Sequence, residues 1–397
     1  MRAFTFRILT GGLAVLLALT ACSPVTVIAP APLPTIAPSI VSATAIPTAT
    51  ATATSTAAAP SFTILPSPPI QSLYMLNAND GWALTDSAVL RTKDGGLTWY
   101  NVTPSGLGGA PASAFFLNNN TTAWVGMMGS DPAAGTLFHT TNGGVTWSSG
   151  SVPFGGGSLK FVDAMHGWEL IGLGAGMFHE AVAVYRTSDG GLSWEQEITD
   201  DPNVSGSSDS LPLEGDKNGI TALDADRGWV TGLVPMSDYI YIYATQDGGR
   251  TWFHQDLALP DGYSGAQTNA ALPVFFGLND AVLPVKLYAN DNGADFYVSH
   301  DGGQNWAATT PVAQGGFLAV ASATDFFVWN GSAPLNVSHD AGATWLTITP
   351  NVNIQDNMVS FQFVNAATGW ALTSDVNYHR SLYRTTDGGE TWNVLIP

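Results

Sequence analysis

The sequence predicts an all-β fold: a seven-bladed β-propeller of four-stranded blades, preceded by a signal peptide and a disordered linker. Two observations predict the propeller. A turn motif of the form Ser/Thr-x-Asp-Gly-Gly-x-Thr-Trp occurs seven times, and consecutive copies are 39 to 58 residues apart, which fits one blade per copy. A composition with 45% apolar and 11% aromatic residues is sufficient for a substantial core.

Residues 1–21 indicate an export signal. Arg2 and Arg7 precede an apolar run over residues 8–19, which is shorter than the about 20 residues of a membrane span. The next residues, Leu19-Thr20-Ala21-Cys22, resemble the lipobox of bacterial lipoproteins. The resemblance implies cleavage before Cys22, acylation of its thiol, and an extracytoplasmic protein anchored by lipid to a bacterial membrane or cell surface. An ordinary secretory signal is the alternative.

Residues 22–70 predict a disordered tether. They consist almost wholly of Ala, Thr, Ser, Pro, Ile and Val, and no charged residue lies between Arg7 and Asp80. Frequent proline blocks helices and sheet ladders, and such tracts bury too little apolar surface to offset the entropy of ordering. We therefore expect the propeller to comprise residues 71–397.

The turn motif predicts a tight hairpin turn in each blade. The Asp or Asn side chain can accept hydrogen bonds from backbone N–H groups, and the Ser or Thr two residues earlier can add another. Ala341 replaces the first glycine in one copy, whereas the second glycine is always present. We therefore expect only the second position to need a positive φ. The acidic or amide position is occupied by Asp94, Asn142, Asp189, Asp247, Asp301, Asp340 and Asp387.

A second tryptophan precedes six of the seven turns, in short apolar strands. These residues are Trp82, Trp124, Trp168, Trp229, Trp329 and Trp370. Together with the seven turn tryptophans they account for all 13 in the chain, so none is left as a separate ligand platform. An Asn or Asp five residues earlier, such as Asn77 or Asp163, predicts a cap of the turn rather than a catalyst.

The turn motif resembles the Asp-box, or BNR repeat, of sialidases, sortilin-type receptors and xyloglucan-degrading glycosidases. The repeated order of Gly-Trp strands and Asp-box turns over residues 72–397 most resembles the seven-bladed propellers of photosystem II assembly factors and their non-photosynthetic relatives. The resemblance implies the fold and says little about function, because the repeated residues are those that build the blade. The Arg-rich partner surface of that family has no counterpart here, since only ten basic residues follow residue 21.

Catalytic candidates are few. A sialidase site needs three arginines, and only Arg227 and Arg380 lie outside the turn positions. Gly172, Gly174 and Gly176 are expected in a hairpin loop. Residues 290–295 offer carboxylate and amide oxygens for a cation, but they lack the full calcium-loop pattern. A glycosidase needs two carboxylates at a suitable separation. Loose candidates for such a pair, outside the repeat positions, are Asp131, Glu169, Glu180, Asp209, Glu214 and Asp216.

Composition limits the partners. A net charge of −19 excludes a basic nucleic-acid footprint, and a single cysteine excludes a disulfide scaffold and a Cys-based zinc site. We expect no catalytic residue, no cofactor and no metal.

The predicted function is that of a surface-anchored, monomeric scaffold for a protein or glycan partner in the cell envelope. An extracytoplasmic glycoside hydrolase, sialidase-like or polysaccharide-degrading, is the alternative. The interval from Trp194 to Trp229 is longer than any other between a turn tryptophan and the next blade. We expect its residues 200–218 to form an acidic loop between the third and fourth blades that contributes to partner binding.

Overall fold

The computed structural model describes residues 62–397, except 109–111, 113, 118, 130–133 and 355–356. The predicted signal peptide, Cys22, most of the predicted tether and Asp131 therefore lie outside the described residues. None of the described residues forms a helix with the length and hydropathy that crossing a membrane requires.

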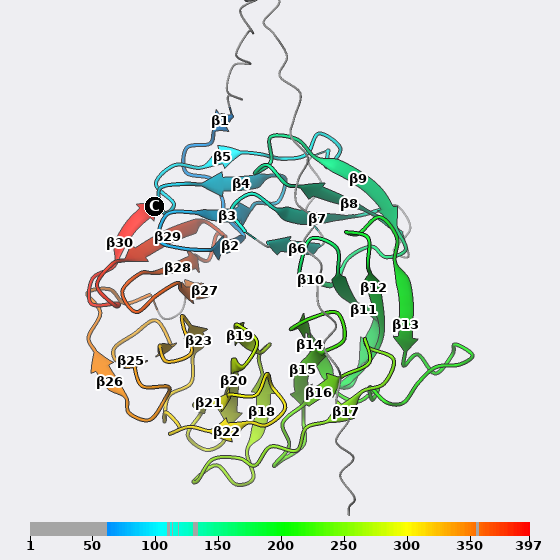
Figure 1. The fold of residues 1–397 in the computed structure, drawn as a ribbon. Helices are drawn as coiled ribbons and strands as arrows, with labels where there is room; N and C mark the ends of the chain where they lie inside the picture. Colours follow the sequence, from blue (N-terminus) through cyan, green and yellow to red (C-terminus); the bar gives the residue numbers. More distant parts are fainter. Residues whose placement is uncertain (1–61, 109–111, 113, 118, 130–133, 355–356) are drawn as a thin grey trace, which may run out of the picture. The chain divides into compact units, whose positions relative to one another are not determined.

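The predicted all-β fold is confirmed. Four consecutive antiparallel strands form each group, and the groups surround a central opening (Figure 1). We call these groups blades one to seven. Blade one comprises β2 (Ser72–Met75), β3 (Gly81–Leu84), β4 (Val89–Thr92) and β5 (Tyr100–Asn101), with β1 (Thr63–Ile64) outside β5. Blade two comprises β6 (Ala114–Leu117), β7 (Ala123–Met128), β8 (Gly135–Thr140) and β9 (Ser148–Val152). Blade three comprises β10 (Ser158–Phe161), β11 (Gly167–Gly176), β12 (His179–Thr187) and β13 (Glu195–Thr199).

Blades four and five share one nine-stranded sheet, because an extra strand, β18 (Gln267–Ala270), pairs with both. Blade four comprises β14 (Asp216–Ala222), β15 (Gly228–Val234), β16 (Ile242–Thr245) and β17 (Phe253–His254). Blade five comprises β19 (Val274–Phe276), β20 (Asp280–Tyr288), β21 (Gly293–Ser299) and β22 (Ala307–Ala308). Blade six comprises β23 (Phe317–Val320), β24 (Phe326–Trp329), β25 (Leu335–Ser338) and β26 (Leu346–Ile348). Blade seven comprises β27 (Met358–Phe363), β28 (Gly369–Ser374), β29 (Arg380–Thr385) and β30 (Asn393–Ile396).

The strand order gives the ring two different faces. The first strand of each blade borders the central opening and the fourth lies at the rim (Figure 1). Since consecutive strands run antiparallel, turns between the first and second and between the third and fourth strands share one face. We call this the turn face. The hairpins between second and third strands and the connections between blades lie on the other, which we call the loop face.

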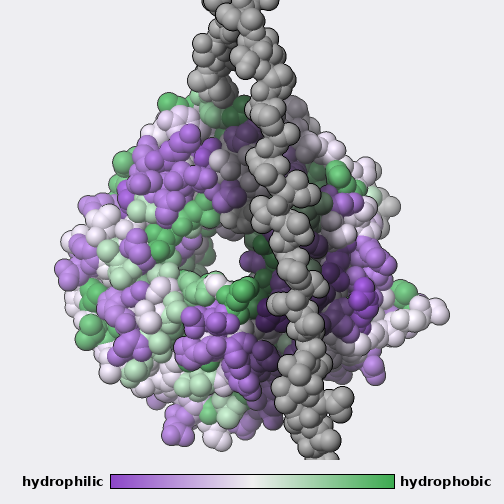
Figure 2. All heavy atoms as spheres, in the orientation of Figure 1, coloured by the Kyte–Doolittle hydropathy of each residue, from purple (hydrophilic) through white to green (hydrophobic). Residues whose placement is uncertain are grey.

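The core lies between the blades. Seven apolar clusters each join residues of two neighbouring blades, and one of them joins blade seven to blade one. The indole N–H of Trp370 in blade seven donates to Gly95 O in blade one at 3.0 Å. Gln362 Nε2 donates to Met75 O at 2.7 Å across the same junction. Packing and hydrogen bonds therefore close the ring, and Figure 2 shows the central opening with apolar surface beside it.

The strand register corrects one tryptophan assignment. Trp82, Trp124 and Trp370 each pair with the residue just before the turn motif, and Trp168 and Trp229 do the same. In blade six that partner, Val337, faces Phe327, while Trp329 lies two residues further on. Phe327 stacks on Phe363 of blade seven at 3.7 Å between centroids, as Trp124 stacks on Phe161 of blade three at 3.8 Å. A phenylalanine thus fills the position that we had given to Trp329.

The folded part begins before residue 71. Thr63 and Ile64 pair with Asn101 and Tyr100, and the side chain of Ile70 is fully buried between blades one and seven. These residues lie in the stretch predicted as tether. Their apolar side chains are too few to stand out in a Pro- and Thr-rich sequence, and only the finished ring offers a surface for them.

Both glycines of the turn motif adopt positive φ, which contradicts the expectation for the first. Gly95 and Gly96 have φ of 78° and 98°, and Ala341 at a first position has φ of 58°. The turn places two successive residues in the left-handed region, which alanine reaches at a cost of about 1 kcal/mol. The second glycine also packs against the neighbouring blade: a Cβ on Gly342 would lie 2.6 Å from Thr309 Oγ1. In blade six the first position thus accommodates an alanine, whereas the second has no room for a Cβ.

Candidate functional site

The hydrogen bonds of the turn motif join its side chains to one another and to its own backbone. Asp94 Oδ1 accepts from Thr98 N and from Thr92 Oγ1, both at 2.9 Å, and Thr92 Oγ1 accepts from Gly96 N at 2.9 Å. Hydrogen bonds from the side chains of Ser193 and Thr344 lower the pKa of Asp189 and Asp340 to about 2. Carboxylates held ionised by their own turns are building elements rather than general acids.

The acidic and amide residues on the turn face cap their turns as well. Asp163 Oδ1 accepts from the backbone N–H groups of Met165 and His166 at 2.7 Å. Asp224 Oδ1 accepts from two backbone groups in the same way, and its Oδ2 pairs with Arg227 at 2.7 Å. Arg227 is thereby engaged on the turn face of blade four. Arg380 begins β29 on the loop face of blade seven and donates to Gln71 Oε1 at 3.1 Å, so the two arginines do not meet.

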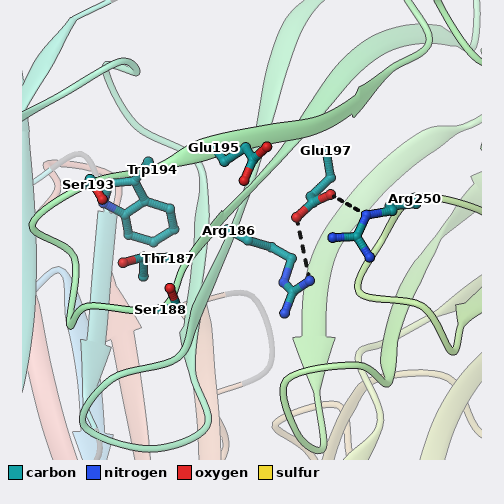
Figure 3. A pocket seen from close by; sticks show the side chains of 8 residues that line it. All are labelled: Arg186, Thr187, Ser188, Ser193, Trp194, Glu195, Glu197 and Arg250. Atoms are coloured by element: carbon teal, nitrogen blue, oxygen red, sulfur yellow. Dashed lines mark hydrogen bonds and ion pairs between the residues drawn. The ribbon is translucent and has the colours of Figure 1, made fainter.

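A pocket of about 300 Å³ opens between the rims of blades three and four (Figure 3). The two arginines that line this pocket are paired with Glu197. Glu197 lies 3.4 Å from Arg186 and 3.3 Å from Arg250. Arg186 also donates to Gly248 O at 3.2 Å, which ties blade three to the turn of blade four. We assign this cluster to the joint between the blades.

The carboxylates proposed for a glycosidase do not form a pair. Glu169 is fully buried on β11, neither oxygen has a hydrogen-bond partner, and burial raises its pKa well above the ordinary value. Its neighbours in the register, Leu159 and Tyr185, belong to the cluster shared with blade two. Glu180 is on β12, and its Oε2 accepts from Lys217 N at 2.6 Å on the side toward blade four. Asp209 and Glu214 are exposed in the loop before β14, which Asp216 begins.

Residues 290–292 form the tip of the β20–β21 hairpin. Asp295 lies beyond the tip on β21, where it is fully buried. Its Oδ1 accepts from Phe296 N at 2.8 Å and Thr309 Oγ1 at 2.7 Å. No group of three or more His, Cys, Asp or Glu residues in the described part could hold a metal ion.

The loop after β13 projects beyond the ring (Figure 1, right) and is held by a buried lysine. The side chain of Lys217 has no exposed surface, and its Nζ donates to the carbonyls of Glu180, Pro212 and Leu213 at 2.8, 2.8 and 3.1 Å. The carboxylate of Asp200 lies 3.6 Å from the same Nζ and accepts from Val182 N at 2.6 Å. We call this arrangement the Lys217 clamp.

The Lys217 clamp changes the interpretation of residues 200–218. Leu211 is fully buried in the core between blades three and four, and residues 216–218 belong to β14. The stretch is therefore an integral part of the ring, so its removal would destabilise the fold. The exposed part of the loop is residues 202–207 together with Asp209 and Glu214.

The clamp also supports the longest hairpin of the ring. Leu170 is the last residue of β11 that pairs with β10, and from Ile171 to Gly176 the strand pairs only with β12 among the described residues. Gly172, Gly174 and Gly176 thus lie in a strand and not in a loop. The hairpin is stiffened on its other edge, because Gly215 N donates to Phe178 O at 2.6 Å and Glu180 N donates to Leu213 O at 2.9 Å.

The tip of this hairpin exposes apolar side chains. Met177 is 92% exposed and Phe178 is 45% exposed, and both have positive φ, of 53° and 61°. Left-handed backbone at two bulky residues is strained. Leu173, Val204 and Met236 are exposed in the same hairpin and in neighbouring loops of the loop face. We call residues 171–178 the blade-three tip.

Sequence reasoning missed the residues that build this feature. Asp200 and Lys217 are 17 positions apart in a polar stretch, and nothing in their spacing indicates an ion pair. The alternation of glycine at 172, 174 and 176 was a usable signal, because a period of two is that of a strand.

Comparisons with known proteins agree with this architecture. The family model of the BNR/Asp-box repeat matches residues 297–308, which carry the turn of blade five. No curated protein matches the sequence. The structure of YCF48 bound to D1 peptide is similar at a TM-score of 0.51 and 16% identity, over 82% of this chain and 96% of that one.

A further solved structure is similar in fold, and a second one aligns at a TM-score below 0.5. Oligogalacturonate lyase from Vibrio parahaemolyticus aligns at a TM-score of 0.54 and 9% identity, over 81% of this chain and 89% of that one. YCF48 from Cyanidioschyzon merolae aligns at a TM-score of 0.47 and 16% identity, over 82% and 98%. Similarity at such low sequence identity shows the fold and leaves function open. The described part of this chain is a BNR-like β-propeller.

Proposed function

We propose that the protein is an envelope-anchored scaffold that binds an extended segment of a partner protein at the blade-three tip. The observation that carries this proposal is the projecting hairpin itself. Its β11 edge has no strand partner beyond Leu170 among the described residues, and an unpaired edge is a template for an added strand. The exposed side chains of Met177 and Phe178 lie next to this edge and offer apolar contacts to the same segment.

The Lys217 clamp supports a role of this hairpin and loop in binding a partner, as opposed to an insertion without function. Burying an ammonium group and a carboxylate costs several kcal/mol each before their attraction is counted. Here both charges hold the base of a hairpin whose strained apolar tip does not contribute to the core. A rigid tip loses little entropy when a partner binds, which raises affinity. The likeness to YCF48 bound to D1 peptide is consistent with a propeller of this kind receiving a peptide.

The hydrolase alternative has weaker support. Glu180 is committed to Lys217, and Glu169 lies on the opposite face of the same sheet, buried and without a polar partner. General acid–base hydrolysis needs two carboxylates that reach one substrate from a shared cleft. The placement of the described candidates does not supply that geometry.

The anchoring rests on Cys22, outside the described residues. We expect Cys22→Ser to move the protein from the membrane fraction to the soluble extracytoplasmic fraction of an expressing bacterium. Acyl chains contribute about 0.8 kcal/mol per buried methylene, and Cys22 is the only cysteine that could carry them. Membrane and soluble fractions probed by immunoblot give the answer. A variant that stays membrane-bound would overturn the lipoprotein assignment.

The partner site is tested by polar substitutions at the tip. We expect Met177→Ser with Phe178→Ser in the full-length chain to reduce capture of the partner from native envelope at least tenfold, with an unchanged melting temperature. Val376→Ser with Tyr378→Ser is the matched control, because these residues are 90% and 82% exposed on the corresponding hairpin of blade seven. Capture that survives the tip variant, or that the control abolishes equally, would place the binding surface elsewhere.

A further inference from the structure

A second feature, at the central opening and away from the blade-three tip, has the chemistry of a small-ligand site. The inner edge of blade five is split: β18 pairs with residues 285–288 of β20, and β19 pairs with residues 280–282. Residues 271–273 connect the two strands, and Ala271 N donates to Pro284 O of β20 at 2.9 Å. A pocket of about 410 Å³ lies at this break, lined by Asn218, Asn269, Ala271, Leu272, Lys286, Phe317 and Leu318.

Lys286 is the charged group of this pocket. Its Nζ lies over the ring of Phe317, 5.4 Å from the centroid, and has no hydrogen bond or ion pair with a described residue. Burial lowers its pKa. The contrast with Lys217 is informative, because that ammonium group is surrounded by carbonyls and a carboxylate. In a chain with 31 acidic residues, the ammonium of Lys286 keeps its three donors for an acceptor from outside.

Two amides beside Lys286 are fixed in orientation. Asn218 Nδ2 donates to Asn269 Oδ1 at 2.5 Å and to Ala270 O at 2.7 Å. These bonds leave Asn218 Oδ1 as an acceptor and Asn269 Nδ2 as a donor, without partners among the described residues. A hydroxyl group both donates and accepts, so this pair suits a hydroxylated ligand. Leu272, Leu318 and Phe317 add apolar wall.

We propose that this pocket binds a sugar carboxylate, a uronate unit. Its carboxylate accepts from Lys286 Nζ, its neighbouring hydroxyls bond to the amides of Asn218 and Asn269, and its C–H face contacts the apolar wall. This inference goes beyond the proposed function, because the pocket lies between blades four, five and six while the partner segment is assigned to blade three.

The test is titration calorimetry on the full-length protein with glucuronate, glucose and N-acetylglycylglycine. We expect glucuronate to bind at least tenfold more tightly than glucose and than the peptide carboxylate. Lys286→Met should abolish the preference. Lys160→Met is the matched control, since Lys160 also lies over an aromatic ring, that of Phe116 at 5.0 Å, and does not line the pocket; it should leave the affinity unchanged.

Each outcome is decisive. Equal affinity for glucose and glucuronate, or unchanged binding by Lys286→Met, would overturn the proposal, and preference for the peptide would assign the pocket to a chain terminus instead. Should Lys286→Met unfold, Asn269→Asp is the second variant: it removes a donor to the hydroxyls of both sugars, but its carboxylate also repels glucuronate, so the preference for glucuronate over glucose should be lost. Partner capture by the blade-three tip is measured separately, so either proposal can fail alone.

Discussion

Lys217→Met is expected to lower the free energy of unfolding by about 3–5 kcal/mol, the range seen when one partner of a buried ion pair is removed. The variant leaves the carboxylate of Asp200 buried without its cation, and three backbone carbonyls lose their donor. Burial already raises the pKa of Asp200 and lowers that of Lys217, so neither charge tolerates isolation. Urea unfolding followed by tryptophan fluorescence measures the change.

A second variant separates charge from packing in the clamp. Asp200→Asn combined with Lys217→Met removes the orphaned charge while an amide oxygen can still accept from Val182 N, so part of the loss should return. Lys93→Met changes an exposed lysine and should alter stability by less than about 0.5 kcal/mol. If Lys217→Met is as stable as the parent, the clamp is not what fixes the loop and the hairpin.

Asp295→Asn is expected to make the protein less sensitive to pH. Burial raises the pKa of Asp295 to about 6, whereas an unfolded aspartate titrates near about 3.9. Well below the unfolded pKa the carboxyl is protonated in both states and its contribution to stability is complete. Between about pH 4 and pH 6 the unfolded chain ionises and the folded one does not, so the contribution falls, and above the folded pKa of about 6 it is lost.

The expected size follows from linkage. A difference of about two pKa units at about 1.4 kcal/mol per unit gives about 3 kcal/mol. Because an unfolded aspartate is already about half ionised at pH 4, the unfolding free energy of Asp295→Asn minus that of the parent should increase by about 2 kcal/mol between pH 4 and pH 8. Urea unfolding of both proteins at the two pH values tests this. A constant difference, or one that falls with pH, would contradict the assignment of a buried carboxyl with a raised pKa.

The blades could be predicted from sequence because their determinants are local. A turn motif in which Asp94 bonds to residues two and four positions away is visible in any window of ten residues. The capping of Asp163 and Asp224 is equally local. Repetition then supplies the number of strands, since each copy brings the same apolar runs between its turns.

Features that depend on contacts between blades were not predictable in the same way. In blade six Phe327, and not Trp329, pairs with the residue before the turn motif, whereas five other copies with a tryptophan at that position favoured Trp329. The positive φ of Ala341 is hidden because an alanine gives no conformational signal. Lys217 and Lys286 look alike in sequence, and only their surroundings show that one is saturated with acceptors and the other is not.

The central claim, that a partner segment adds to the blade-three tip, is tested most directly by hydrogen–deuterium exchange of the full-length protein with and without the captured partner. A strand added to the open edge gives new acceptors to the backbone N–H groups of residues 171–176 that point away from β12, so these amides should exchange at least tenfold more slowly in the complex. The turn-face amides around Asp94 and Asp340 should be unchanged. Protection confined to the turn face, with residues 171–176 exchanging as fast as in the free protein, would contradict the account.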